Sequence, residues 1–190
     1  MANRRAPSDR SKKPLGAAKL DELALAYVAR FATSRAKLTR YLARKIRESE
    51  WMDDGDAMTA CEAVADRMER LRFLDDRQYA AMRAGAMTRR GLGARRVRAQ
   101  LFVDGIAEED SGEAIAEAED KALAAAIGFA RRRRFGPFAV RPADDPKDRE
   151  RQVAAFARAG HSLALARRIL AVPPGDADAL AALDAEAAVD

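Results

Sequence analysis

The sequence predicts an all-α protein, built as an elongated, curved array of three tandem three-helix repeats. Apolar residues recur at helical spacing between residues 20 and 170, which is typical of amphipathic helices. Much of the 48% hydrophobic content is alanine, and only 6% of the residues are aromatic. This mix favours closely packed helices with shallow interfaces over one thick core. Similar segments return after roughly 50–60 residues, as in repeat proteins.

The overall composition limits the possible partners and sites. The net charge of +5 favours an acidic partner, such as nucleic acid or an acidic protein surface. Cys61 is the only cysteine, so the chain can form neither an internal disulfide nor a cysteine zinc cluster. No apolar run reaches the ~18 residues of a transmembrane helix, and no secretory signal is visible. We therefore expect a cytoplasmic protein that does not contact a membrane.

Residues 1–19 are predicted to form a disordered basic arm. They contain six basic residues, one acidic residue, two prolines and almost no large apolar side chain. Such a segment cannot bury enough apolar surface to fold on its own. It either keeps the protein in solution as a flexible arm or adds electrostatic affinity for a polyanion.

The first predicted repeat spans residues 20–74. Leu20, Ala24 and Tyr27 share one face of its first helix, and Leu38 and Leu42 share a face of the second. We expect Ser34 or Thr33 to cap the second helix and Asp56 to cap the third, where Cys61 is a small core residue. Basic residues surround the stripe of the second helix, and these are Arg35, Lys37, Arg40 and Arg44.

The second predicted repeat spans residues 75–120 and contains two helices joined by a tight turn. Its first helix is expected to bury one face, made of Tyr79, Met82, Ala86 and Met87. Gly91 supplies a left-handed stop, because glycine takes that conformation without steric cost. Val97 and Leu101 mark the buried side of the next helix, and Gly105 ends it. Residues 108–120 form a third, strongly acidic helix.

Arginines crowd the turn and the second helix of this repeat. They are Arg89, Arg90, Arg95, Arg96 and Arg98. A short helix with this many like charges is destabilised unless an anion faces it. The run is either a solvated surface or a binding surface.

The third predicted repeat spans residues 121–172 and carries a proline-rich insertion at residues 139–146. Its first helix ends in a run of arginines, which are Arg131, Arg132, Arg133 and Arg134. We expect Gly160 to end a later helix and His161 or Ser162 to start the last one. Residues 173–190 contain five acidic residues and no basic one, and they are predicted to form a frayed or weakly helical acidic tail.

The repeats are related by their spacing. Asp21 and Asp76, which precede tyrosine-bearing helices, are 55 residues apart, and Leu38 and Val97 are 59 residues apart. Glu-Ala-Val-Ala at 62–65 corresponds to Glu-Ala-Ile-Ala at 113–116, a shift of 51 residues. One such unit buries little apolar surface, so stacking between neighbours should supply part of the core.

Three stretches of the chain carry a resemblance to a known family. They read ALAYVARFATSRAKLTRYLARK, AVADRMERLRFLDDRQYAAMRAGAMTRRGLGARRVRAQLFVDGI and AAFARAGHSLALARRIL. From about residue 21 to residue 170 the chain resembles the RecX family of bacterial recombinase regulators. It departs from the family pattern at Arg72, where glycine is common, and at residues 159–161, where Arg-Gly-Phe is common.

The resemblance implies a non-enzymatic regulator of the RecA recombinase. It implies binding to the RecA monomer and to the RecA filament on single-stranded DNA. The bound regulator would inhibit the recombinase, coprotease and ATPase activities, and so modulate DNA repair and the SOS response. We also expect a monomer with weak, salt-sensitive affinity for single- and double-stranded DNA. The residues predicted to bind the partner or DNA are Arg35, Lys37, Arg40, Arg44, Arg89, Arg90, Arg95, Arg96, Arg98, Arg131, Arg132, Arg133 and Arg134.

Several other functions find little support in the sequence. There is no G-x-x-x-x-G-K-[ST] motif and therefore no sign of an ATP-binding P-loop. His161 is the only histidine, which excludes paired-histidine metal sites, and we expect no catalytic residue, metal or cofactor. The alternative function is a helix-turn-helix transcription regulator that uses the helix at 94–103, and a third is a helical scaffold with an incidental basic surface.

Overall fold

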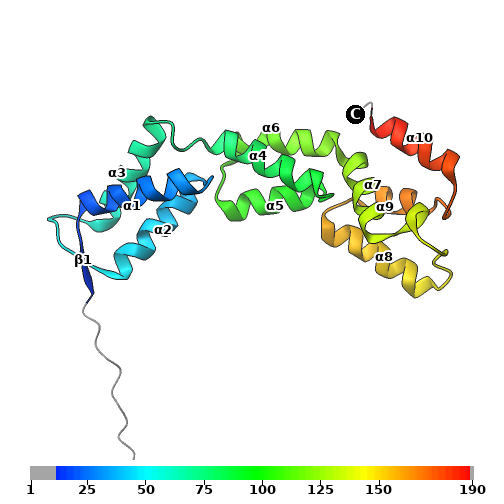
Figure 1. Ribbon diagram of the computed structural model, residues 1–190, viewed down its shortest axis with the longest axis horizontal. Coiled ribbons are helices and arrows are strands. Elements are labelled where there is room, and N and C mark those ends of the chain that lie inside the picture. Colours follow the sequence, from blue (N-terminus) through cyan, green and yellow to red (C-terminus); the bar gives the residue numbers. More distant parts are fainter. Residues whose placement is uncertain (1–11, 189–190) are drawn as a thin grey trace, which may run out of the picture. The chain divides into compact units, whose positions relative to one another are not determined.

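The computed structural model describes residues 12–188, and this part of the chain is almost entirely helical (Figure 1). The predicted all-α class is therefore confirmed, whereas the number of repeats and the curvature of the array stay predictions. The helices are α1 (Ala17–Arg30), α2 (Arg35–Arg47), α3 (Ala57–Arg70), α4 (Asp76–Arg89), α5 (Ala94–Asp104), α6 (Glu108–Asp120), α7 (Ala122–Arg133), α8 (Pro146–Ala159), α9 (Leu163–Leu170) and α10 (Ala177–Ala187), with a short 3-10 helix, η1 (Gly136–Phe138).

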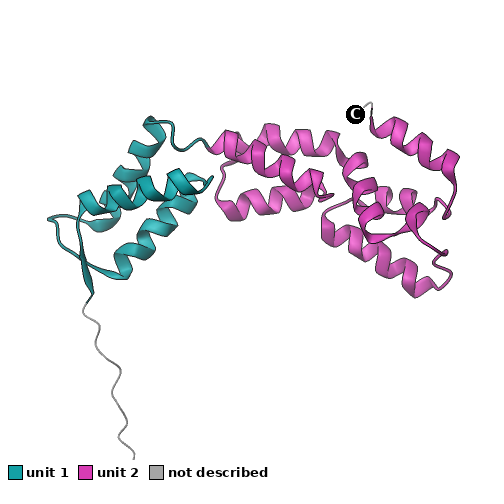
Figure 2. Cartoon of the chain, in the orientation of Figure 1, with its two compact units in different colours: residues 1–75 teal, residues 76–190 magenta. Residues whose placement is uncertain are grey.

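The chain divides into two compact units, residues 1–75 and 76–190 (Figure 2). This boundary lies one residue from the predicted edge between the first and second repeats. The first unit contains the first triplet, which we define as α1, α2 and α3. The second unit contains the second triplet (α4, α5 and α6), the third triplet (α7, α8 and α9) and α10.

The first triplet surrounds its own apolar core, in which Leu20, Leu38 and Leu42 are completely buried. Two short strands, β1 (Lys13–Leu15) and β2 (Ser49–Trp51), pair in parallel beside it. Leu15 is only 4% exposed, so the core holds β1 in place.

The prediction of a disordered arm is therefore wrong for residues 13–19, which form β1 and the first residues of α1. One apolar side chain, Leu15, together with pairing to a distant strand, orders a segment that is otherwise polar. Residues 1–11, the rest of the predicted arm, lie outside the described residues.

Local capping residues set many of the helix ends. The side chains of Ser34, Asp56 and Ser162 accept hydrogen bonds from backbone N–H groups of the first helical turns of α2, α3 and α9. Gly105 and Gly160 end α5 and α8 in the left-handed conformation, with φ of 80° and 94°. These predicted helix ends are confirmed.

The second triplet buries a different face of α4 than the sequence predicted. Tyr79 and Met87 are buried as expected, but Met82 is 52% exposed. Ala80 and Ala84 lie inside instead, in the same apolar cluster as Ala114 and Ala118 of α6. Because α4 and α6 pack along each other through alanines, small residues occupy the interface and the longer methionine lies outside it.

The third triplet has a core centred on Phe156, Ile169 and Ala126, all completely buried. The acidic tail was predicted to be frayed or weakly helical, and the helical alternative is observed over residues 177–187, which form α10. Leu183 of α10 is 5% exposed and belongs to the third core. Asp176 caps the helix, which helps to explain why a segment without basic residues is regular.

The burial of side chains recurs between the first two triplets. Residues 61–70 of α3 and residues 111–120 of α6 have the same order of buried and exposed positions. The ends of the helices agree, since Leu71 and Lys121 are the C-caps. The two helices therefore correspond at a shift of 50 residues rather than the predicted 51. The N-caps Ser34 and Gly93 keep the predicted shift of 59.

Candidate functional site

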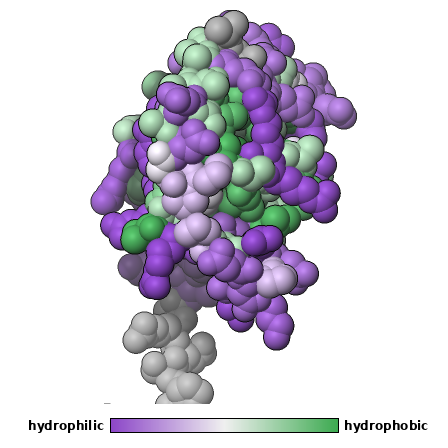
Figure 3. Space-filling model, turned by 90° about the vertical axis from the view of Figure 1, so that its right-hand side faces the viewer, coloured by the Kyte–Doolittle hydropathy of each residue, from purple (hydrophilic) through white to green (hydrophobic). Residues whose placement is uncertain are grey.

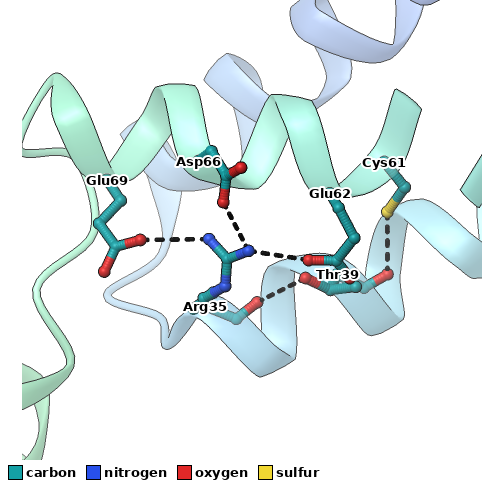
Figure 4. Close-up of polar contacts among 6 residues, drawn as sticks. All are labelled: Arg35, Thr39, Cys61, Glu62, Asp66 and Glu69. Carbon is teal, nitrogen blue, oxygen red and sulfur yellow. Dashed lines mark hydrogen bonds and ion pairs between the residues drawn. The ribbon is translucent and has the colours of Figure 1, made fainter. Parts of the chain in front are cut away.

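The first predicted binding residue, Arg35, already forms ion pairs within the first triplet (Figure 4). Its guanidinium nitrogens lie 2.8 Å from Glu62, 2.7 Å from Asp66 and 3.1 Å from Glu69, all on α3. Burial alone would lower the pKa of Arg35, but the hydrogen bond and charge of Asp66, with the charges of Glu62 and Glu69, raise it above its usual value. Arg35 therefore ties α2 to α3.

The neighbouring thiol of Cys61 also belongs to the core. Its Sγ donates to the backbone oxygen of Thr39 at 3.7 Å, and the side chain is completely buried (Figure 4). Burial raises the pKa of the Cys61 thiol, and the charge of Glu62 raises it further. A thiol that stays protonated is a poor nucleophile and metal ligand, so Cys61 is a packing residue.

The other predicted residues of α2 lie closer to solvent. Arg40 and Arg44 are exposed, and Lys37 is half-buried. Arg44 lies 5.6 Å from the centre of the Tyr41 ring and 3.8 Å from Glu48. To bind a partner, Arg44 would therefore have to give up only a weak surface ion pair.

In the second triplet, α5 presents an outer face that combines charge with apolar surface. Arg95 and Arg96 are exposed and form no ion pair within residues 12–188. Arg98 is paired with Glu119 of α6 at 2.9 Å. One or two turns further along, Phe102 is 82% exposed and Val103 is 62% exposed. An exposed aromatic side chain beside unpaired arginines is typical of a binding surface.

The position of α5 depends on a buried carboxylate at its end. Asp104 is 2% exposed, and its oxygens accept hydrogen bonds from the hydroxyl of Tyr79 at 2.8 Å and the amide of Gln100 at 3.0 Å. The guanidinium of Arg83 lies 3.5 Å away. A carboxylate at a helix C-terminus is unfavourable for the helix dipole, so these partners are needed to hold it there.

The backbone of the tight turn before α5 is in direct contact with the backbone of the third triplet. The Gly93 N–H donates to the carbonyl of Ala159 at 2.9 Å. A Cβ added at Gly93 would lie 2.4 Å from the carbonyl oxygen of Gly160, and one at Gly160 would lie 2.5 Å from the backbone nitrogen of Arg96. Only glycine permits this crossing, which we call the glycine junction (Gly91, Gly93 and Gly160).

His161 of the third triplet also contacts the glycine junction. Its Nε2 lies 3.0 Å from the carbonyl oxygen of Gly91, and its ring lies beside Phe129 and Phe156. Its Nδ1 is buried without a hydrogen-bond partner within the described residues, so Nε2 carries the proton and donates. Burial lowers the pKa of His161 below its usual value, against a smaller opposing effect of the Gly91 hydrogen bond. His161 is therefore a packing residue that lies directly before Ser162, the N-cap of α9.

The junction also brings arginines of the two triplets together. The guanidinium of Arg132 lies 3.5 Å from the carbonyl oxygen of Arg89 and beside Gly91. Arg89 and Arg90 are exposed at the same turn. The structure thus places three of the predicted binding residues around one turn.

The remaining arginines at the end of α7 have different surroundings. Arg131 faces Asp184 of α10 at 3.5 Å and the ring of Phe138 at 5.1 Å, so the acidic helix partly covers it. Arg133 lies 5.5 Å from the centre of the Phe135 ring. Arg134 is the C-cap of α7 and is left-handed, with φ of 55°.

Two hollows in the third triplet lie on either side of the loop 139–143. One, of about 460 Å³, is lined mainly by apolar and small residues. In the space-filling view, hydrophobic residues form a patch near the middle of the face shown, with hydrophilic residues on both sides of it (Figure 3). The other hollow, of about 620 Å³, is lined by arginines that include Arg141, Arg151 and Arg158.

The sequence prediction missed these last three residues. Arg151 and Arg158 are seven residues apart on α8, so helical spacing could have placed them on one face. The position of Arg141 in a loop gave no such signal.

Within residues 12–188, no group of three or more histidine, cysteine, aspartate or glutamate side chains is arranged to hold a metal ion. The helices of this part of the chain are also too short or too polar to cross a membrane.

Comparison with known proteins gives consistent relatives, although no family model matches the chain. Regulatory protein RecX of Myxococcus xanthus is 31% identical over 156 residues, which cover 80% of this chain and 83% of the relative. Regulatory protein RecX of Agrobacterium fabrum is 33% identical over 108 residues, or 57% of each chain. The crystal structure of RecX from Lactobacillus salivarius aligns with a TM-score of 0.60 at 15% identity and covers 89% of this chain and 97% of that one. A second crystal structure, of regulatory protein RecX, aligns with a TM-score of 0.57 at 19% identity, over 80% of this chain and 70% of that one.

Proposed function

This chain belongs to the RecX family of regulatory proteins, and on that premise we propose that it binds the RecA recombinase and its filament on single-stranded DNA. Bound there, it inhibits the recombinase, coprotease and ATPase activities and so modulates DNA repair and the SOS response. It acts in the cytoplasm as a monomer, without a cofactor and without catalysis of its own.

The observation that carries this proposal is the unpaired arginine surface of the second unit. Within residues 12–188, neither Arg95 and Arg96 on α5 nor Arg133 and Arg134 at the end of α7 forms an ion pair. Guanidinium groups form strong, directional hydrogen bonds with carboxylates and phosphates. A protein filament on DNA offers both kinds of acceptor, so it suits this surface.

The glycine junction supports the proposal because it fixes the geometry of the surface. Arg96 follows Gly93 by three residues, and its backbone lies against Gly160. The arginines of α5 and of α7 are therefore held on one compact unit. Preorganised charges lose less conformational entropy when they bind a partner.

A titration of recombinase ATPase on single-stranded DNA tests the proposal. Substoichiometric amounts of the wild-type chain should lower the ATPase rate. The Arg95→Ala/Arg96→Ala double variant should need several-fold more protein for the same inhibition, because both residues lack ion-pair partners in the described part of the chain. The matched control is Arg70→Ala/Arg77→Ala, which removes the same charge from exposed positions outside the proposed surface.

Two outcomes would contradict this assignment. Equal inhibition by the Arg95→Ala/Arg96→Ala variant and the control would remove α5 from the surface. No inhibition by the wild-type chain, combined with a preference of ~10³ or more for one duplex sequence, would indicate a transcription regulator instead.

A further inference from the structure

We propose that the arginine-lined hollow of the third triplet is a binding site for the phosphodiester backbone of single-stranded DNA. We call it the arginine pocket and define it by Arg133, Arg134, Arg141, Arg151 and Arg158. The inference rests on the proposed function for its biological setting, but it names a ligand and residues that can be tested on this chain alone.

The net positive charge of the arginine pocket favours the binding of an anion. Five arginines line a space of about 620 Å³, and Asp148 is the one acidic residue among its lining residues. Asp148 lies 3.0 Å from Arg151 and is therefore already paired. Four positive charges remain uncompensated by the lining residues, and like charges held around one hollow destabilise each other. An anionic ligand relieves this repulsion.

The backbone of Arg134 is the second, independent observation. Arg134 caps α7 with φ of 55° and ψ of 50°, a left-handed conformation in which a Cβ is unfavourable. The equivalent C-cap positions of α5 and α8 are occupied by Gly105 and Gly160. An arginine in a glycine position costs stability, and such strain is characteristic of functional sites. Here the residue in the strained conformation is one of the arginines that line the pocket.

The surroundings of the charges favour a nucleic-acid strand over an acidic peptide. A sugar-phosphate backbone carries one charge per nucleotide, so a few consecutive phosphates can meet several arginines. A peptide would have to direct several acidic side chains into the same hollow. Val140, which is 85% exposed, and Ala139 line the same hollow and offer apolar contact to sugars or bases. Guanidinium planes also stack on bases that are not paired.

Fluorescence anisotropy with a labelled oligodeoxythymidylate tests the proposal on the full-length chain without recombinase. The Arg141→Ala/Arg158→Ala variant should bind several-fold more weakly than wild type at low salt. The slope of log K against log salt should become shallower by about 0.7 for each phosphate that the variant no longer neutralises. The Arg70→Ala/Arg77→Ala control should keep nearly the wild-type slope.

The Arg134→Gly variant separates binding from folding. Glycine suits the left-handed cap, so its melting temperature should equal or exceed that of wild type. Its affinity for the oligonucleotide should nevertheless fall, because the variant lacks one guanidinium. A variant that is more stable and yet binds less well cannot be explained by damage to the fold.

The possible outcomes distinguish this inference from the proposed function. Wild-type affinity in both Arg134→Gly and Arg141→Ala/Arg158→Ala would overturn the arginine pocket, even if the chain inhibits recombinase. Displacement of the oligonucleotide by poly-glutamate at equal charge concentration would overturn the choice of a nucleic acid over an acidic peptide. Weakened oligonucleotide binding by the variants, in a chain that does not inhibit recombinase, would support the pocket and refute the proposed function.

Discussion

Replacement of Gly93 by alanine tests whether the glycine junction holds the second and third triplets together. The new Cβ would lie 2.4 Å from the Gly160 oxygen, 2.6 Å from the Gly160 carbonyl carbon and 2.8 Å from the His161 nitrogen. All three atoms belong to the backbone, so no side chain can rotate away. The φ and ψ of Gly93, −78° and 162°, suit alanine, so the expected effect is a steric clash and not backbone strain.

The expected loss of stability follows from these close approaches. Overpacking typically costs about 1–3 kcal/mol, and the upper end applies where only backbone can move. Separation of the two segments also breaks the Gly93 N–H bond to Ala159, which contributes about 1 kcal/mol. Removal of glycine from the N-cap of α5 adds at most about 1 kcal/mol. We therefore expect Gly93→Ala to destabilise the second unit by roughly 4–5 kcal/mol.

Urea denaturation with two probes measures this effect. Far-UV circular dichroism should show a lower midpoint for Gly93→Ala, because it reports helices of both units. Trp51, the only tryptophan, lies in the first unit beside a core that contains no residue of the second. Its fluorescence midpoint should stay near that of wild type.

Gly112 provides the matched control. It lies inside α6, and a Cβ there would meet nothing within 4 Å. Gly112→Ala should therefore stabilise the chain by about 0.5–1 kcal/mol. A destabilisation of about 1 kcal/mol or less for Gly93→Ala would be explained by the cap alone, and would refute the close backbone crossing.

Three further predictions concern His161, Tyr79 and α10. Because burial lowers the folded-state pKa of His161, the unfolded chain binds more protons near pH 6. The free energy of unfolding, measured by urea titration, should therefore fall from pH 6.5 to 5.5, and His161→Gln should remove this fall. Tyr79→Phe should cost about 2 kcal/mol in the same assay, since it removes a hydrogen bond to buried Asp104, whereas Tyr27→Phe in the first triplet should be nearly neutral. Asp184→Asn/Glu186→Gln should raise the affinity for oligodeoxythymidylate several-fold at low salt, because it frees Arg131 and Arg168 from their ion pairs. The control variant is Asp178→Asn/Glu113→Gln. Equal affinity of the two variants would show that α10 does not cover these arginines.

The sequence was informative wherever the cause of a structural feature is local. Ser34 and Asp56 cap helices because their side chains reach a backbone N–H three residues away, and Leu38 and Leu42 are buried because one helical turn separates them. The pairing of β1 with β2 depends on residues about 36 positions apart, which no local pattern reveals. The docking of α10 likewise depends on one leucine and on arginines of other helices.

The candidate site shows the same limit more clearly. Charge runs identified Arg95, Arg96, Arg133 and Arg134, and their role in binding stays a prediction. The same reasoning included Arg35, although three carboxylates of α3 surround its guanidinium. A carboxylate series at 62, 66 and 69 follows helical spacing, so it could have indicated an internal partner for one of the arginines of α2. The sequence shows how many arginines are present, whereas ion pairs between helices decide which of them remain available to bind a partner.

The glycine junction and the arginine surface depend on each other. Arg89, Arg96 and Arg132 lie around the turn at which two segments of backbone touch, so their mutual repulsion acts directly on that contact. Glycines permit the approach, while His161 and Ala159 supply the hydrogen bonds that hold it. Because repulsion between exposed charges is screened by salt, the second unit should be more stable at about 0.5 M than at about 0.05 M sodium chloride. An anion bound at this turn would stabilise the unit through the same charges, so binding of a polyanion and rigidity of the junction are expected to increase together.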